Sequence, residues 1–243
     1  MTVAPNPATS TRRRFLAALA GSVLVLAAVI VVRRYGPAPA GLIVVPPTVA
    51  VLLVLGHAGG LSWTEMGLAR RNWRRGVAYG LIAVALIGAV YALAAVLPVT
   101  RSAFLDARYH HGMQVGLITA FVVVPVGTVL LEEVAFRGVI LGLCHRHVGR
   151  RRGMVLSSAL FGLWHVLPSL RLNQVNPAVG AVVGRGPSGE LIAVLGAVCF
   201  TGAAGLLFCE LRRRSGSLLA AAGLHWATNA LAVVVAMVLW WRH

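Results

Sequence analysis

Three short fragments place polar side chains inside otherwise apolar sequence. They are Glu132-Glu133-Val134-Ala135-Phe136-Arg137, Phe161-Gly162-Leu163-Trp164-His165 and His225-Trp226-Ala227-Thr228-Asn229. Ionisable groups at membrane depth are costly unless they pair with each other or line a wet cavity, so each fragment is a candidate functional site. Two of the six acidic residues of the chain are adjacent in the first fragment, and this arrangement calls for a chemical explanation.

Helical spacing separates the roles of the two adjacent carboxylates. Glu133 and Arg137 are four residues apart, so on a helix they share one face and can neutralise each other. Glu132 is rotated by about 100° from Glu133, so Arg137 is badly placed to serve both. We therefore expect Glu132 to face a cavity, a partner helix or water, where a desolvated carboxyl can act as a general base or acid. The alternative is a structural Glu–Arg clasp in which Glu132 is protonated or reaches the interface.

The other two fragments supply imidazoles and an amide. His165 shares a helical face with Phe161, whose ring can wall one side of the imidazole, while Trp164 points elsewhere. His225 and Asn229 are also four apart and present their side chains to the same point. Such a pair can bind a metal, form an oxyanion hole or simply join two helices. A lone histidine of this kind is more often a packing residue, but the three fragments together provide the groups that a hydrolytic site needs.

The composition indicates that the protein lies in a lipid bilayer. Hydrophobic residues make up 58% of the chain and charged residues 12%, against about 25% charged in soluble domains, and the mean hydropathy is +0.83. Apolar stretches long enough to cross about 30 Å of hydrocarbon recur along the sequence. We therefore predict an all-α, polytopic integral membrane helix bundle. It would form one domain over residues 1–243, with a motif-bearing core at about 114–241 and accessory helices in 1–113.

About seven spans are predicted. They lie near residues 15–32, 41–57, 77–98, 114–144, 153–168, 191–211 and 217–241. With a cytoplasmic amino terminus, fourteen arginines fall on the inside and seven on the outside, which favours this orientation of a multi-pass protein in the cell membrane. The run Thr11-Arg12-Arg13-Arg14 before the first span, with Ala38-Pro39-Ala40 as a cleavage site, also resembles a twin-arginine export signal. Arg33 and Arg34 directly after the span favour a retained helix.

The net charge of +16 would indicate nucleic acid binding in a soluble protein. Here the arginines lie almost entirely between apolar stretches, so orientation and anionic lipid headgroups explain them and no nucleic acid partner is expected. All 22 basic residues are arginine, as expected of a GC-rich, bacterial genome. We expect Cys144, Cys199 and Cys209 to be small buried hydrophobes, since no CxxC spacing occurs.

The order Glu-Glu-x-x-x-Arg, Phe-x-x-x-His and His-x-x-x-Asn on successive membrane helices resembles the CPBP group of intramembrane proteases. This group joins the type II CAAX prenyl endopeptidases to bacterial bacteriocin-processing and immunity proteins, also called Abi proteins. The resemblance covers about residues 114–241 and extends weakly to Trp63-Thr64-Glu65-Met66-Gly67-Leu68, a short amphipathic stretch before an Arg-rich loop.

The resemblance implies a role for each matching residue. Glu132 would polarise the attacking water, helped by His165, and Glu133 would be held by Arg137 as structural support. His225 and Asn229 would stabilise the oxyanion of the tetrahedral intermediate. The group is commonly described as metal-dependent, and Glu132, His165 and His225 could form a three-ligand zinc site with an open position. A metal-free, glutamate-activated water fits the same residues, and both mechanisms stay open.

The resemblance thus implies an intramembrane endopeptidase, a CPBP-type enzyme with or without a metal, that cleaves a peptide bond at or within the bilayer. A membrane-associated peptide or small membrane protein is a better substrate for a bacterium than a prenylated CAAX protein. Two alternatives remain: a non-proteolytic scaffold or immunity protein of the same fold, and a transporter or proton-relay protein. A haem protein with His165 and His225 as axial ligands is a more distant one. The sequence does not indicate an oligomeric state.

Overall fold

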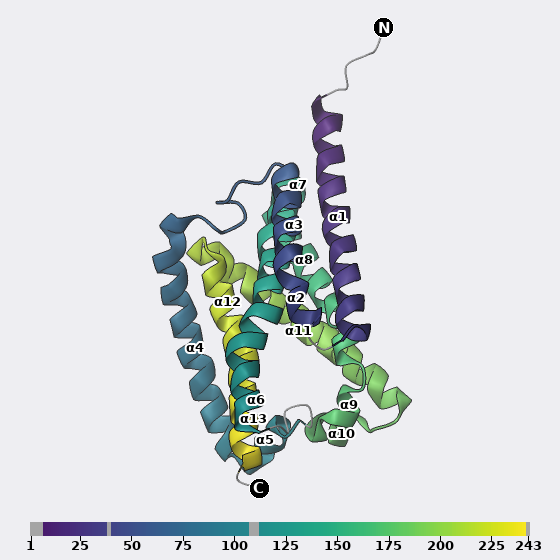
Figure 1. Ribbon diagram of the computed structural model, residues 1–243, viewed down its shortest axis with the longest axis vertical. Coiled ribbons are helices and arrows are strands. Elements are labelled where there is room, and N and C mark those ends of the chain that lie inside the picture. Colours follow the sequence, from purple (N-terminus) through teal and green to yellow (C-terminus); the bar gives the residue numbers. More distant parts are fainter. Residues whose placement is uncertain (1–6, 38–39, 107–111, 242–243) are drawn as a thin grey trace.

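The computed structural model describes residues 7–37, 40–106 and 112–241. In these residues every regular element is a helix, so the predicted all-α class is confirmed (Figure 1). Ala38 and Pro39 of the alternative cleavage site, and the arginines at 108 and 242, lie outside the described residues.

Within the described residues, six helices are long and apolar enough to cross a membrane: Thr11–Tyr35, Ala40–Ala58, Arg70–Val96, Met113–Val148, Pro187–Ser215 and Leu218–Trp241. A seventh candidate is broken, because Arg150–Trp164 and Leu167–Val175 are bent by 43° from each other. The predicted spans are therefore found, with the one near 153–168 interrupted beside His165. A helix satisfies all its backbone hydrogen bonds within the segment, which is why apolar sequence of this length takes this form in lipid.

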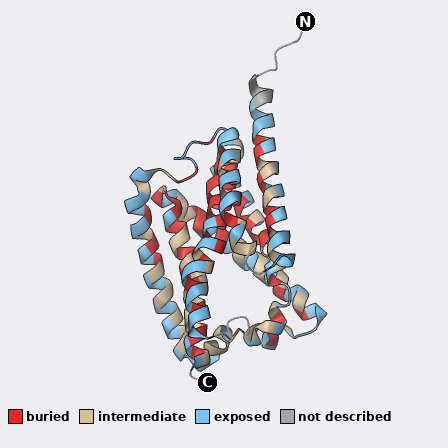
Figure 2. Cartoon of the chain, in the orientation of Figure 1, coloured by how far each residue is buried: buried red, intermediate tan, exposed pale blue. Residues whose placement is uncertain are grey.

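The first half of the chain supplies the outer helices. α1 (Pro7–Tyr35) packs beside α3 (Val45–Ala58), and α2 (Ala40–Ile43) joins them. A single turn, η1 (Arg70–Asn72), leads into α4 (Trp73–Val96), and α5 (Pro98–Arg101) and η2 (Ser102–Phe104) follow it. Large apolar side chains on α1 and α4 are exposed, among them Leu24, Leu81 and Leu86, and Figure 2 shows exposed positions along both helices. These faces are suited to contact lipid.

The second half carries the three polar fragments. One long span consists of α6 (Met113–Ile118), the π-helical segments η4 (Thr119–Leu130) and η5 (Glu133–Ile140), and α7 (Leu141–Val148). α8 (Arg150–Trp164) runs back, and the short elements η6 (Leu167–Ser169), α9 (Leu172–Val175) and α10 (Pro177–Val183) follow it. α11 (Pro187–Ser215) is the next span. The last span consists of α12 (Leu218–Trp226), the π-helical η7 (Ala227–Leu231) and α13 (Ala232–Trp241).

Small residues let the inner helices approach each other closely. A Cβ atom on Gly223 of α12 would lie 2.6 Å from the Cα atom of Gly80 of α4, and one on Gly162 of α8 would lie 2.7 Å from the Val198 carbonyl oxygen of α11. Close backbone approach of this kind is how membrane helices associate when lipid is as apolar as their side chains. The largest cluster of buried residues surrounds η5, which packs against α3, α7, α8 and α12.

The segment between α3 and η1 packs back onto the helix that carries the glutamate pair. Ser62 donates to the Glu65 carboxylate through its backbone N–H and its hydroxyl, a capping box that lowers the pKa of Glu65. Met66 is fully buried, and Arg212 of α11 donates to the Glu65 carbonyl over 2.7 Å. This stretch, to which the family resemblance extends weakly, therefore supports the glutamate helix from outside.

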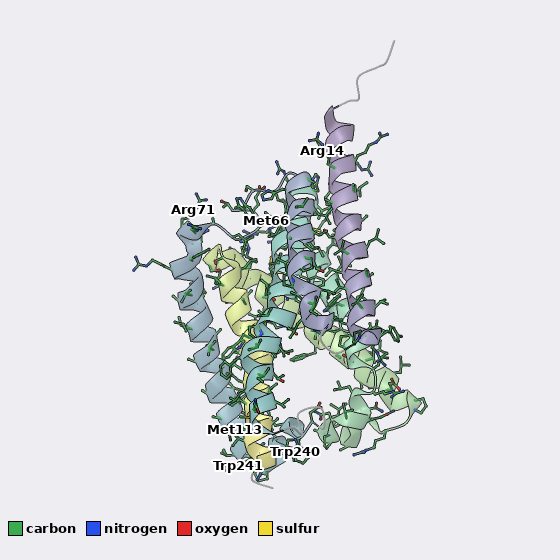
Figure 3. The ribbon with its side chains drawn as sticks, viewed as in Figure 1. Arg14, Met66, Arg71, Met113, Trp240 and Trp241 are labelled. Carbon is green, nitrogen blue, oxygen red and sulfur yellow. The ribbon has the colours of Figure 1, made fainter. Side chains whose placement is uncertain are left out.

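The Arg-rich segments lie together. The amino-terminal part of α1, the start of α4, the α7–α8 turn and the α11–α12 turn lie toward one end of the bundle in Figure 1. Figure 3 shows Arg14 and Arg71 toward this end, and Met113, Trp240 and Trp241 toward the opposite end. The arginine-rich segments are expected to lie at one end when successive spans cross the membrane in opposite directions.

The prediction that all three cysteines are buried is wrong for one of them. Cys144 and Cys209 are buried and free, but Cys199 is exposed on α11. The reason is that Cys199 lies on the side of this helix that also exposes Phe200 and Leu195.

Candidate active site

The two adjacent glutamates lie deep inside the bundle, where η4 gives way to η5. Glu132 is 3% exposed and Glu133 is 2% exposed. The ion pair that the four-residue spacing predicts is present, because Arg137 Nη1 lies 3.4 Å from Glu133 Oε1. Arg137 is itself fully buried. Buried charges of this kind persist only when they are paired.

His225 completes this buried group from α12. Its Nδ1 atom lies 2.8 Å from Glu133 Oε1, and because a carboxylate can only accept, Nδ1 carries the hydrogen. Its Nε2 atom lies 3.7 Å from Glu132 Oε2. The imidazole is thus held between the two carboxylates, with one glutamate at each nitrogen.

Two phenylalanines hold the charged groups in place. The Arg137 guanidinium carbon lies 3.8 Å from the ring centre of Phe161 and 4.6 Å from that of Phe208. Phe208 also stacks on His225, with ring centroids 5.2 Å apart. Cations over aromatic faces are stabilised most when water is excluded. Phe208 was not predicted from the sequence, because nothing local to α11 indicates that its ring meets Arg137 and His225 of two other helices.

Glu132 is held by Trp164, a residue that was predicted to point elsewhere. The Trp164 indole Nε1 donates to Glu132 Oε1 over 2.9 Å, so the expectation that Trp164 points away from the site is wrong. Trp164 is the last residue of α8, and its indole lies near Phe136 of η5, which brings the N–H to the carboxylate. The second oxygen, Glu132 Oε2, is buried without a hydrogen bond.

His165 lies at the break after α8. Its Nδ1 atom is 2.7 Å from the Phe161 carbonyl oxygen. A carbonyl can only accept, so Nδ1 carries the hydrogen and the neutral ring presents the Nε2 lone pair on its other side. The Phe161 ring walls the imidazole edge-on at a centroid distance of 4.6 Å, as the spacing predicts.

Asn229 lies in η7, and its Nδ2 atom donates to the His225 carbonyl oxygen over 3.0 Å. Asn229 lines a cavity of the structure, and His225 is not among the residues that line it. The expectation that both side chains are presented to one point is therefore not met. The reason is that the Glu133 carboxylate of another helix holds the His225 ring in the buried interior.

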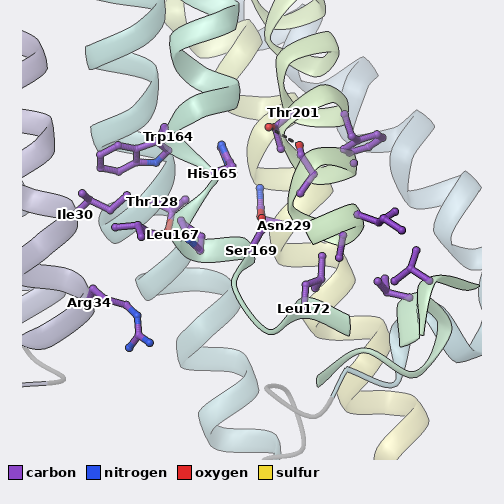
Figure 4. Close-up of a pocket in the computed structure, with 18 of the residues that line it drawn as sticks. Ile30, Arg34, Thr128, Trp164, His165, Leu167, Ser169, Leu172, Thr201 and Asn229 are labelled. Atoms are coloured by element: carbon purple, nitrogen blue, oxygen red, sulfur yellow. Dashed lines mark hydrogen bonds between the residues drawn. The ribbon is translucent and has the colours of Figure 1, made fainter. Parts of the chain in front are cut away.

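The cavity has a volume of about 920 Å³. Its polar lining includes Glu132, Trp164, His165 and Asn229, and much of the remainder is apolar surface from α9, α10 and α11. Figure 4 shows His165 and Asn229 near the middle of this lining, with Trp164 and Arg34 on the α1 side. A cavity that joins a carboxylate, an imidazole and an amide to an apolar wall can hold an apolar peptide beside groups that move protons.

The proposed zinc ligands do not form a metal site. Within the described residues no three His, Cys, Asp or Glu side chains come together in a way that could hold a metal ion. Glu132, His165 and His225 are therefore not gathered as zinc ligands in this structure, and the proposed mechanism uses the side chains alone.

Comparison with known proteins identifies the part of the chain that contains these groups. Residues 114–231 match the model of the Rce1-like type II CAAX prenyl endopeptidases. Searches of curated proteins and of solved structures give no significant match. The matched segment runs from α6 to the end of η7 and includes all three polar fragments. The predicted resemblance is confirmed: residues 114–231 of this membrane protein form a domain of the Rce1-like type II CAAX prenyl endopeptidase kind.

Proposed function

We propose that the protein is an intramembrane endopeptidase that hydrolyses a peptide bond of a membrane-associated peptide or protein. The family is one of proteases. The observation that carries the proposal is the setting of Glu132, which lines the cavity, accepts the Trp164 N–H and keeps one oxygen without a hydrogen bond. His165 and Asn229 line the same cavity.

Glu132 is the general base in this proposal. It removes a proton from a water molecule, whose oxygen attacks the carbonyl carbon of the scissile bond. The carboxyl group then returns the proton to the nitrogen that leaves, so atoms and charge balance over the reaction. The neutral His165 ring can accept a hydrogen bond from the same water through Nε2, which supports its assignment as the helper of Glu132.

Asn229 stabilises the negative charge that develops, whereas His225 contacts the base instead. One hydrogen of Asn229 Nδ2 is used by the His225 carbonyl, and the other remains available to an oxyanion in the cavity. His225 acts on Glu132 from the buried side.

The substitution that tests this function is Glu132→Gln, which keeps the acceptor for Trp164 and removes the base. Purified protein in detergent micelles would be incubated with a library of synthetic apolar peptides, and products would be detected by mass spectrometry. We expect cleavage by the wild type and at least a hundredfold loss in the variant, since positioned general bases contribute about 10²–10⁴ in rate. We expect His165→Ala to behave similarly, because both residues serve one step.

The alternatives give different results in the same assay. A Glu132→Gln protein that cleaves at the wild-type rate would exclude the mechanism. Absence of cleavage by a folded wild type would favour a scaffold or immunity protein. Flux through reconstituted vesicles that depends on Glu132 would favour a transporter.

The zinc requirement is tested separately by chelation. Because the three expected ligands are not gathered as zinc ligands in this structure, we expect cleavage to survive dialysis against a chelator. Loss of activity that zinc restores would mean that Glu132, His165 and His225 rearrange around a metal.

The membrane orientation remains a proposal supported by the grouping of arginines at one end of the bundle. We propose that this end faces the cytoplasm, which places the amino terminus inside. Reporter fusions after Arg152 and after Arg185 should then report opposite sides. A cytoplasmic signal at both positions would contradict the orientation assigned to α8 and the elements that follow it.

A further inference from the structure

The cavity has a cationic edge that comes from outside the family-matched segment. Arg33 and Arg34, at the end of α1, line it together with the polar groups of the site. Figure 4 shows Arg34 at the α1 side of the cavity. The matched segment begins only at residue 114, so this edge is a feature of the present chain beyond the family motifs.

Arg33 reaches the helix that carries the base. It is half-buried, and its Nη2 atom donates to Thr128 Oγ1 over 3.5 Å. Thr128 precedes Glu132 by one helical turn, and both residues line the cavity. A helical turn is about 5 Å long, so a group bound by Arg33 would lie within a few residues of a peptide bond placed beside Glu132, since an extended residue spans about 3.3–3.6 Å.

The two guanidinium groups have no carboxylate partner among the described residues. Five of the six acidic side chains have partners outside the cavity: Glu65 with Arg146, Asp106 with Asn176, Glu133 with Arg137, Glu190 with the Arg171 backbone, and Glu210 with Arg213 and Arg214. The sixth, Glu132, lines the cavity and bonds to Trp164 rather than to either arginine. Guanidinium groups bind carboxylates through paired, directional hydrogen bonds. The edge is therefore a cationic surface with open donors beside an apolar cavity.

We propose that Arg33 and Arg34 form a specificity subsite for a carboxylate on the peptide substrate, two to three residues from the bond that is cleaved. The proposal rests on the proposed function, because it assumes a peptide in this cavity. It narrows the substrate class to apolar peptides that carry an acidic group at one position. The half-buried Arg33 and its bond to the glutamate helix favour a substrate group over a lipid phosphate, which would reach only the exposed Arg34.

The test uses matched peptides that differ only in Glu, Gln or Lys at each position up to four residues from the cleaved bond. For the wild type in detergent we expect kcat/KM to be about tenfold higher for Glu than for Gln at one position. The double variant Arg33→Gln/Arg34→Gln should remove this preference and still cleave the Gln peptide. The matched control is Arg13→Gln/Arg14→Gln, which removes the same charge from the other end of α1 and should keep the preference.

A charge swap sharpens the test. Arg34→Glu should prefer the Lys peptide at the position where the wild type prefers Glu. Equal cleavage of the Glu, Gln and Lys peptides by the wild type would overturn the subsite and leave the proposed protease function intact. A preference that survives the loss of both arginines would also overturn it.

Binding separates the subsite from catalysis. The Glu132→Gln protein should bind the Glu peptide more tightly than the Gln peptide, and adding Arg33→Gln/Arg34→Gln should abolish the difference. This result without any cleavage by the wild type would contradict the proposed function and support the subsite. If peptide binding shows no preference and the arginines instead raise thermal stability in phosphatidylglycerol but not phosphatidylcholine vesicles, the ligand is a lipid headgroup and the proposal is wrong.

Discussion

Two Glu–Arg pairs with the same four-residue spacing lie in opposite surroundings. Glu133 and Arg137 are 3.4 Å apart, with side chains 2% and 1% exposed. Glu210 and Arg214 are 2.7 Å apart, with side chains 29% and 60% exposed. The exposed pair has the shorter distance, and Glu210 also contacts Arg213. Contact geometry alone would therefore rank the exposed pair as the stronger one.

The surroundings reverse this ranking. Water solvates and salt screens the exposed charges, so either one can lose its partner at little cost. The buried guanidinium has no such substitute, and its three nitrogens lack hydrogen bonds within the described residues. Removing the partner of a buried charge is strongly destabilising. Comparison of the two pairs shows that burial decides which pair the fold depends on, whereas the spacing only allows the pair to form.

The largest effect is expected for Glu133→Gln. This variant leaves Arg137 without a carboxylate and weakens the acceptor for His225 Nδ1. The loss of folding free energy should be about 3–5 kcal/mol, so folded protein is lost first and cleavage as a consequence. Thermal unfolding in detergent measures it, and Glu132→Gln is the matched control, because it changes the adjacent carboxylate without breaking the ion pair. Equal destabilisation by both variants would mean that the whole cluster is structural.

A smaller effect is expected for Arg137→Lys, which keeps the charge and removes the planar guanidinium between Phe161 and Phe208. Cation–aromatic contacts in water-free surroundings contribute about 2 kcal/mol, and an ammonium group stacks less well than a guanidinium. Arg214→Lys makes the same replacement in the exposed pair and should not change the unfolding temperature. If the two variants change the unfolding temperature equally, the contact of the Arg137 guanidinium with the Phe161 and Phe208 rings makes no measurable contribution to stability.

The sequence predicted the spans and the Glu133–Arg137 pair well, because long apolar runs and a four-residue spacing are local properties. The interruption at His165 was not predicted, since Pro168 three residues later was the only local signal for it. The partners of Glu132 and His225 could not be predicted for a different reason. Trp164 of α8, Phe208 of α11 and His225 of α12 come from separate helices, and only the packing of these helices sets which of them meet.

The pair of His225 and Asn229 shows a further limit of spacing arguments. The spacing of Glu133 and Arg137 predicted their contact even though η5 is π-helical. For His225 and Asn229 the spacing could not indicate which side chain lines the cavity. The Glu133 carboxylate, which comes from another helix, holds the His225 ring in the interior.

A prediction of intermediate size concerns the hydrogen bond that orients the base. Trp164→Phe keeps the ring against Phe136 and removes the N–H that Glu132 accepts. Hydrogen bonds to charged groups contribute about 1.5–3 kcal/mol, so kcat should fall by about tenfold or more, with little change in KM. The matched control is Trp226→Phe, whose indole donates to the Ala120 carbonyl instead. An equal fall of kcat in both variants would show that loss of any indole N–H disturbs the bundle.

The smallest effect is expected for Glu210→Gln. Its carboxylate contacts two arginines at short distances, and burial does little to strengthen either contact. Removing the charge leaves Arg213 and Arg214 exposed to water and to anionic headgroups, which solvate them in place of the lost partner. The unfolding temperature in detergent should therefore match that of the wild type at both low and high salt. A loss comparable to that of Glu133→Gln would show that this end of the bundle is as poorly solvated as its interior, and burial would then no longer explain the difference between the two pairs.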